Sequence, residues 1–287
     1  MITNILTVDF EEWFVVENLR GKVTDSEWEG LTPRIEENGY KILELFNAYQ
    51  VQATFFILGW IAEKYPNMVA AIARNGHEIG CHSYGHRRVD TLSRDEFEKD
   101  TRQAVKVIKE ASGVVPVGYR APSWSINSKI PWAFEVLADL GFLYDSSIFP
   151  IKHDIYGEPD APRSAFRMKL DSGKLLYEMP ASTVSMWGKN FPVGGGGYLR
   201  HAPYWFTSWM IRRQNNKNRP VIIYIHPWEI DENHPRIDGL TQFQKYRQYG
   251  SISTLMIKLE KLLQEFDFSP AKDYINQLIR KPIGFER

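Results

Sequence analysis

Two histidines that stand four residues apart, His82 and His86, could converge on one cation with an acidic side chain from the segment that holds Asp9 and Glu11. Residues i and i+4 share one face of a helical turn, and imidazole and carboxylate groups are common zinc ligands. Three protein ligands would leave a fourth position for water, as in catalytic zinc sites. This spacing predicts a metal site, although isolated His-x-x-x-His pairs also occur on surfaces and in cores.

Further segments, in a fixed order along the chain, strengthen the interpretation of the histidine pair as a metal site. They are Thr7–Trp13, Thr54–Gly59, Gly76–His82, Tyr119–Trp124 and Ile222–Glu229. Together they resemble the motifs of the polysaccharide deacetylase family, also known as the NodB-homology or family 4 carbohydrate esterases. The resemblance extends over roughly residues 1–265.

The resemblance implies that Asp9 is the general base and that a nearby acid binds the metal. Most family members place that acid directly after the aspartate, but Phe10 stands there in this sequence. The Asp-x-Glu pattern is similar to a subgroup whose ligand lies two residues on, which indicates Glu11. Residues 9 and 11 of an extended strand face the same side, whereas Glu12 would face away. Glu12 remains the alternative ligand.

The other motifs imply the remaining residues of the site. His82 and His86 match the two metal-binding histidines, and Arg120 matches the arginine that orients the catalytic aspartate. Trp124 is expected to line the substrate groove. His226, at the end of an apolar segment, matches the general acid.

The resemblance also implies a carboxylate that tunes this histidine, and Asp145 is the candidate, although an Asp-Ser pair after a strand is equally typical of a plain turn. These residue types suit hydrolysis of an N-acyl bond. Asp9 would accept a proton from water, and His226 would protonate the leaving amine. One divalent metal ion is the expected cofactor; Zn²⁺ is favoured, and Co²⁺, Ni²⁺, Mn²⁺ and Fe²⁺ are the alternatives, because the ligand set alone does not select among them.

Composition fits an enzyme without a polyanionic partner. The chain has 287 residues, with 35 basic and 35 acidic side chains, so no net charge favours nucleic acid. Cys81 is the single cysteine, which excludes an intramolecular disulfide. The first motif begins within the first ten residues and no basic and apolar leader precedes it, so we expect a cytoplasmic location.

Strand and helix patterns alternate over the first half of the chain, which predicts parallel strands and an α/β architecture. Thr32 and Pro33 are expected to be the N-cap and first residue of a helix that runs to Tyr49. The later elements are expected at 54–58, 60–74, 77–81, 93–111, 116–119, 131–140 and 142–146. The resemblance refines this to a distorted, incomplete (β/α)7-like barrel, in a single catalytic domain over residues 1–287.

Residues 147–220 are rich in turn formers and are expected to form an irregular insertion or lid over the barrel mouth. They resemble segments of deacetylases linked to exopolysaccharide and O-antigen biosynthesis. His153, Arg163 and Arg200 are candidates for binding an anionic or hydroxylated ligand. The aromatic segment 204–213 is expected to be a buried helix; contact with a membrane that carries a lipid-linked glycan is the alternative. Residues 250–287 are expected to be a helical extension that packs on the barrel or forms an oligomer contact.

The sequence therefore predicts a metal-dependent N-deacetylase that acts on an amino sugar of a bacterial surface polysaccharide or its precursor. An amidase or cyclic-imide hydrolase that acts on a small non-sugar amide is the alternative enzyme. A carbohydrate-binding protein without catalysis is the alternative of a different class. The expected partner is an N-acylated sugar or glycan, and no nucleic-acid partner is expected. The sequence is compatible with a homo-oligomer.

Overall fold

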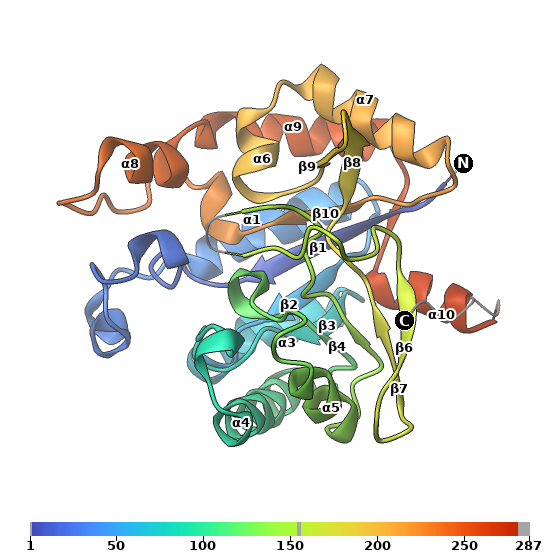
Figure 1. Cartoon of the computed structure of the whole chain (residues 1–287). Helices are drawn as coiled ribbons and strands as arrows, with labels where there is room; N and C mark the ends of the chain where they lie inside the picture. Colours follow the sequence, from blue (N-terminus) through green and yellow to red (C-terminus); the bar gives the residue numbers. More distant parts are fainter. Residues whose placement is uncertain (1, 154–155, 281–287) are drawn as a thin grey trace.

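A curled, mostly parallel sheet forms the centre of the computed structural model, which describes residues 2–153 and 156–280 (Figure 1). The strand order is β10-β1-β2-β3-β4-β5-β7-β6, with β11 paired to β1, and only the β6–β7 pair is antiparallel. The bounds are β1 (Asn4–Phe10), β2 (Thr54–Ile57), β3 (Glu78–Cys81), β4 (Gly118–Tyr119), β5 (Tyr144–Asp145), β6 (Phe166–Lys169), β7 (Leu175–Glu178), β10 (Ile222–Ile225) and β11 (Phe268–Ser269).

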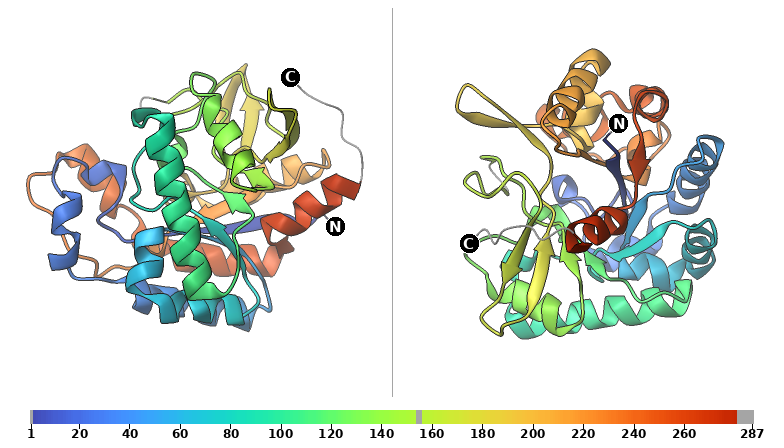
Figure 2. Two further views of the ribbon diagram at one scale, coloured as in Figure 1. Left: turned by 90° about the horizontal axis from the view of Figure 1, so that it is seen from below. Right: turned by 90° about the vertical axis from the view of Figure 1, so that its right-hand side faces the viewer.

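Helices connect the parallel strands and pack on the outside of the curled sheet (Figures 1 and 2). They are α1 (Ile35–Ala48), α2 (Gly59–Lys64), α3 (Pro66–Arg74), α4 (Arg94–Ser112) and α5 (Trp132–Asp139). Apolar residues of the strands and of the inner helix faces form one large core with two smaller clusters beside it. The predicted α/β class and incomplete barrel are confirmed.

Two helix starts differ from the sequence prediction for local reasons. The helix expected over 60–74 is two helices, because Pro66 lacks a backbone N–H and begins α3. The helix expected to begin with Pro33 begins at Ile35. The Glu12 side chain satisfies the first helical donors instead of Thr32: Glu12 Oε1 accepts from Arg34 N at 2.7 Å and from Ile35 N at 2.9 Å.

The second half of the chain builds a wall beside the barrel mouth. Its elements are the hairpin β8 (Thr183–Met186) and β9 (Lys189–Pro192), α6 (Gly196–His201), α7 (Tyr204–Asn215), the 3₁₀ turn η5 (Pro227–Ile230), α8 (Gln242–Tyr249), α9 (Ile252–Glu265) and α10 (Ala271–Arg280). The described residues of segment 147–220 therefore form two helices and four strands between turns. α9 packs on η5 and on α6. The part of the predicted 250–287 extension beyond residue 280 lies outside the described residues.

Helix α7 has one buried and one exposed face. Met210 and Ile211 are buried, whereas Trp205 is 70% exposed and Trp209 is 42% exposed. The predicted buried helix is thus correct for one face only. Among the helices described, none combines the length and the apolar character that crossing a bilayer requires.

Candidate metal centre and active site

Strand β1 and the residue that follows it place three polar side chains, Thr7, Asp9 and Glu11, on one side. The residues between them, Val8 and Phe10, belong to the hydrophobic core on the other side. This is the period of two that an extended strand imposes. Asp9 and Glu11 are both almost fully buried, at 3% and 2% exposed, so two carboxylates lie inside the barrel mouth. Burial of unpaired carboxylates is unfavourable, so both need cationic or metal partners.

His82 and His86 follow β3 in a loop and not on a helix, so the prediction of a shared helical face is wrong. Ser83 and His86 have positive φ angles of 63° and 51°, a backbone conformation that L-residues adopt rarely and that clusters at functional sites. The Asp100 carboxylate holds the loop by accepting a hydrogen bond from Tyr84 N at 2.8 Å. The tight loop, rather than a helical turn, turns both imidazoles toward one point.

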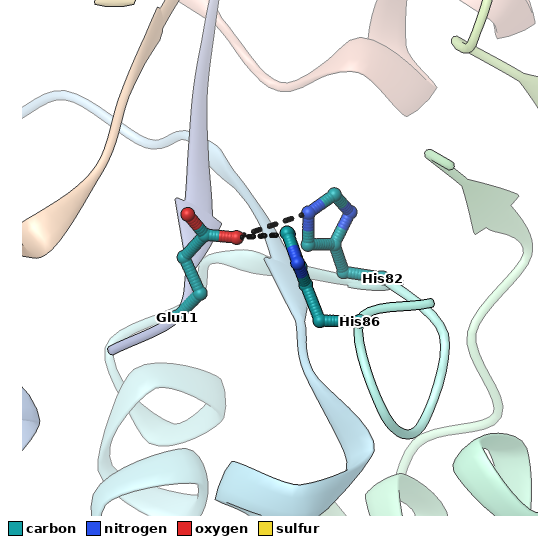
Figure 3. A group of neighbouring side chains, drawn as sticks. All are labelled: Glu11, His82 and His86. Carbon is teal, nitrogen blue, oxygen red and sulfur yellow. Dashed lines mark ion pairs between the residues drawn. The ribbon is translucent and has the colours of Figure 1, made fainter. Parts of the chain in front are cut away.

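Figure 3 shows Glu11 at the end of β1 facing both histidines. Glu11 Oε2 lies 2.7 Å from His86 Nε2 and 3.4 Å from His82 Nε2. One ligand atom from each of the three residues lies within 4.8 Å of the others. His82 Nδ1 lies 2.7 Å from the Arg120 carbonyl oxygen, so an Nδ1–H donates there and the Nε2 lone pair faces the cluster.

The three-residue cluster fits a divalent cation. Glu11 Oε2 is fully buried and has no well-formed hydrogen bond. Burial would raise the pKa of Glu11, but His86, His82 and His226 together hold it well below its usual range, so the carboxylate is anionic. An anionic oxygen and two imidazole nitrogens at one point are a donor set for zinc and its neighbours in the transition series. These observations support the predicted ligands Glu11, His82 and His86.

Glu12 points away from this cluster. Its carboxylate accepts hydrogen bonds from the backbone N–H groups of Arg34 and Ile35 at the start of α1. Burial raises the pKa of Glu12 to about 7, despite these hydrogen bonds. Glu12, the alternative ligand, therefore stabilises the start of α1 and does not face the cluster.

Replacing Glu12 by glutamine is expected to leave bound metal unchanged, whereas Glu11→Gln is expected to lose it. The folded chain keeps the Glu12 proton up to about pH 7, and the unfolded chain releases it near 4.5, so the free energy of unfolding falls as the pH rises through this window. Glu12→Gln should remove that part of the pH dependence. Metal analysis and urea unfolding at several pH values check both statements, and metal loss in Glu12→Gln would make Glu12 the ligand.

Arg120 is fully buried and connects residues of β1 to Ser146, which follows β5. Its Nη1 donates to Asp9 Oδ1 at 2.7 Å and to Thr7 Oγ1 at 2.8 Å, and its Nη2 donates to Ser146 Oγ at 3.0 Å. The guanidinium also lies 4.9 Å from the Trp124 ring centroid. With every side of Arg120 engaged, the Asp9 carboxylate has one fixed orientation. This geometry supports the predicted orienting role.

His226 lies at the carboxyl end of β10 and faces Asp9, with 3.8 Å between His226 Nε2 and Asp9 Oδ2. Its other nitrogen, Nδ1, lies 2.7 Å from Glu229 Oε2. Burial alone would lower the pKa of His226, but Glu229, followed by Glu11 and Asp9, raises it to about 9. Glu229 therefore favours the protonated imidazolium, which is the form that a general acid needs.

Asp145 does not contact His226, so the structure contradicts the predicted tuning carboxylate. Its Oδ1 accepts a hydrogen bond of 2.5 Å from Ser147, and burial raises its pKa to about 6. Burial and the neighbouring Asp145 raise the pKa of Glu178 well above the usual range, so the neutral form of Glu178 is favoured. The carboxylate that lies beside His226 is that of Glu229.

Arg200 completes a buried chain from His226 to the second half of the molecule. Its Nε donates to Glu229 Oε1 at 2.7 Å, and its Nη atoms donate to the carbonyl oxygens of Gly250 and Arg247. Arg200 is 1% exposed. All three guanidinium nitrogens thus donate to Glu229 or to the chain at and after α8. The structure therefore does not support the predicted role of Arg200 in ligand binding.

Glu229→Gln is expected to move the basic limb of the pH–rate profile to lower pH by about one unit or more. The rate falls when the general acid loses its proton, and removal of the Glu229 charge lowers the pKa of His226 from its value of about 9. Asp145→Asn is the matched control, because it removes a buried carboxyl group that does not touch His226. Measurement of kcat against pH for both variants checks this. If the basic limb lies at the same pH in wild type and Glu229→Gln, Glu229 does not raise the pKa of the general acid.

One cavity of about 670 Å³ is lined by Asp9, Glu11, His82, His86, His226 and Glu229. Arg120 and Asp145 are not among its lining residues. Of the predicted substrate-binding residues, Trp124, His153 and Arg200 line it. Arg163 does not; it lines a separate hollow of about 70 Å³ with Arg219. The further lining residues that the sequence analysis missed include Tyr156, Tyr198, Tyr224, Trp228, Glu229 and Arg247.

A curled α/β half-barrel with a His/Glu cluster at the carboxyl ends of its strands defines the class of this chain. A family model described as polysaccharide deacetylase matches residues 29–144, and one described as a domain of unknown function (DUF3473) matches residues 146–276. Residues 29–144 are thus similar to the polysaccharide deacetylases of the NodB-homology type, which agrees with the resemblance seen in the sequence. Asp9, Glu11 and His226 lie outside the range of the first match.

Two curated relatives are similar to about a third of the chain. A peptidoglycan-N-acetylglucosamine deacetylase of Bacillus cereus is 36% identical over 96 residues, which are 33% of this chain and 35% of that protein. A peptidoglycan deacetylase of Helicobacter pylori is 32% identical over 108 residues, which are 38% of this chain and 36% of that protein. The matches thus span about a third of the length of these relatives.

A solved structure extends the comparison of the fold to nearly the whole chain. The crystal structure of a probable polysaccharide deacetylase from Pseudomonas aeruginosa PAO1 matches with a TM-score of 0.63 at 15% identity. The match covers 97% of this chain and 91% of that chain. It confirms the NodB fold.

Proposed function

We propose that this chain is a metal-dependent N-deacetylase that acts on an amino sugar of a bacterial surface polysaccharide or of its precursor. The observation that carries the proposal is the meeting, in one cavity, of the Glu11–His82–His86 cluster with Asp9 and His226. A binding protein needs no such pair of proton-transfer groups. The relatives named as peptidoglycan deacetylases support the substrate class.

Glu11, His82 and His86 would hold the divalent ion, which polarises an amide carbonyl and lowers the pKa of water when bound. The Asp9 carboxylate, oriented by Arg120, accepts a proton from the attacking water. His226, protonated because of Glu229, gives a proton to the nitrogen as the C–N bond breaks. Water and amide thus become acetate and a free amine.

Two alternatives remain, and one experiment separates them from the proposal. Purified protein reconstituted with Zn²⁺, Co²⁺, Ni²⁺ or Mn²⁺ is offered N-acetylated oligosaccharides and a panel of small amides and cyclic imides. Acetate release from the oligosaccharides supports the proposal, and turnover of the imides alone supports the alternative hydrolase. Glycan binding without turnover under any metal would support the non-catalytic protein. The cytoplasmic location stays a prediction.

A further inference from the structure

The end of the cavity built by the second half of the chain contains a cationic group that the proposed chemistry does not use. Arg247, on α8, lines the cavity, and its Nη2 lies 3.0 Å from His153 Nε2. Its guanidinium lies 5.1 Å from the Phe243 ring centroid. Its backbone carbonyl is anchored by the buried Arg200, so α8 is held in place next to the cavity.

A row of packed rings fixes this cationic end relative to the catalytic centre. Trp124, beside Arg120, contacts Phe149 with 5.2 Å between ring centroids. Phe149 stacks on Tyr156 at 5.7 Å, and Tyr156 stacks on His153 at 4.0 Å. His153 then meets Arg247. The row leaves little freedom to the His153 ring, whose Nε2 accepts from Arg247 Nη2, so the Arg247 guanidinium is preorganised.

The charge of Arg247 has no partner among the carboxylates of the cavity. Of the four acids that line it, Asp9, Glu11 and Glu229 are engaged with Arg120, the histidine cluster and Arg200. The fourth acid, Glu17, pairs with Arg20 at 3.1 Å. Within residues 2–153 and 156–280, no carboxylate forms an ion pair with Arg247. An anionic group of a ligand would complete this site.

We propose that the cavity selects an N-acylated glycan that carries a carboxylate or a phosphate, and that Arg247 and His153 bind this anionic group. The inference rests on the proposed function, and it names its substrate class. Guanidinium and carboxylate or phosphate form paired, charge-assisted hydrogen bonds, which gives orientation as well as affinity. His153, Tyr156 and Arg247 all lie in the matched domain of unknown function, so that domain would select the substrate.

The test measures binding on the metal-loaded Asp9→Asn variant, so that no substrate is consumed. Three probes are compared by titration calorimetry: a neutral chitin tetrasaccharide, a tetrasaccharide of alternating N-acetylglucosamine and glucuronate, and UDP-N-acetylglucosamine. At least one anionic probe is expected to bind about tenfold tighter than the neutral one. Adding Arg247→Gln should abolish this preference. Arg102→Gln, an exposed arginine on α4, is the matched control that should keep it.

Equal or undetectable binding of all three probes, or a preference that survives Arg247→Gln, would overturn the inference. Preference for the glucuronate probe identifies a carboxylate ligand, and preference for the nucleotide sugar identifies a phosphate. A melting curve verifies that each variant folds, and His153→Gln gives an independent second variant that should weaken the preference in the same direction. Absence of acetate release by the wild-type enzyme would contradict the proposed function and leave this comparison valid.

Discussion

Replacing both His82 and His86 by alanine is expected to lower the metal content from about one divalent ion per chain to almost none. Both Nε2 atoms face Glu11 Oε2, so the double variant removes two of the three ligands in the cluster. A single carboxylate does not retain a transition metal against dilution. Mass spectrometry of the metal content after dialysis measures this directly.

Metal binding should also raise the thermal stability of the protein. Added Zn²⁺ is expected to raise the Tm of the metal-free wild-type protein, because the ion binds only the folded site and relieves the buried Glu11 charge. The double variant should show no such rise. His201→Gln is the matched control: His201 lines the same cavity but lies outside the cluster, so metal content should stay at the wild-type level. Equal metal content in wild type and double variant would exclude this site.

Replacing Asp9 by asparagine is expected to lower kcat by about 10²–10⁴-fold, the range that loss of a positioned general base produces. The change is nearly isosteric, and the asparagine side-chain oxygen can still accept the hydrogen bond from Arg120. Asp9 is not part of the metal cluster, so metal content should stay at the wild-type level. Steady-state kinetics at full metal loading, with metal analysis of the same sample, checks both statements.

The orienting role of Arg120 supplies a comparison for this variant. Asp9→Asn removes the base and keeps the Arg120 contacts. Thr7→Val keeps the base and removes one hydrogen bond from Arg120 and one to the Ile223 carbonyl oxygen. We expect Thr7→Val to have a much smaller effect on kcat. A kcat of Asp9→Asn close to that of the wild type, at equal metal loading, would show that another group accepts the proton.

The local pattern of the sequence was sufficient for the strands and for the side chains that they carry. Alternation along Thr7–Glu11 depends only on the geometry of an extended strand, so it correctly placed Asp9 and Glu11 together. The alternation of apolar strand segments with helical segments predicted the parallel sheet. These features are determined by neighbours in sequence, and they could be predicted without knowledge of the packing.

The partners of the catalytic groups were decided by the tertiary structure. The geometry of the histidine loop depends on Asp100, which lies on helix α4. The carboxylate that contacts His226 is Glu229, three residues further on, and a sharp 3₁₀ turn after Pro227 brings it back. The signal was present in His-Pro-Trp-Glu, because a glutamate three residues after a turn begins can reach back to its start.

The division between the two has a physical origin. The sequence by itself determined which residue types stand at the ends of which strands, because backbone geometry repeats with a short period. Only the tertiary structure decided that Arg200 is buried against Glu229, that Arg163 lies outside the cavity and that Arg247 lies inside it. Long, flexible arginine side chains go where distant segments leave space and partners, and those segments meet only after the chain has folded.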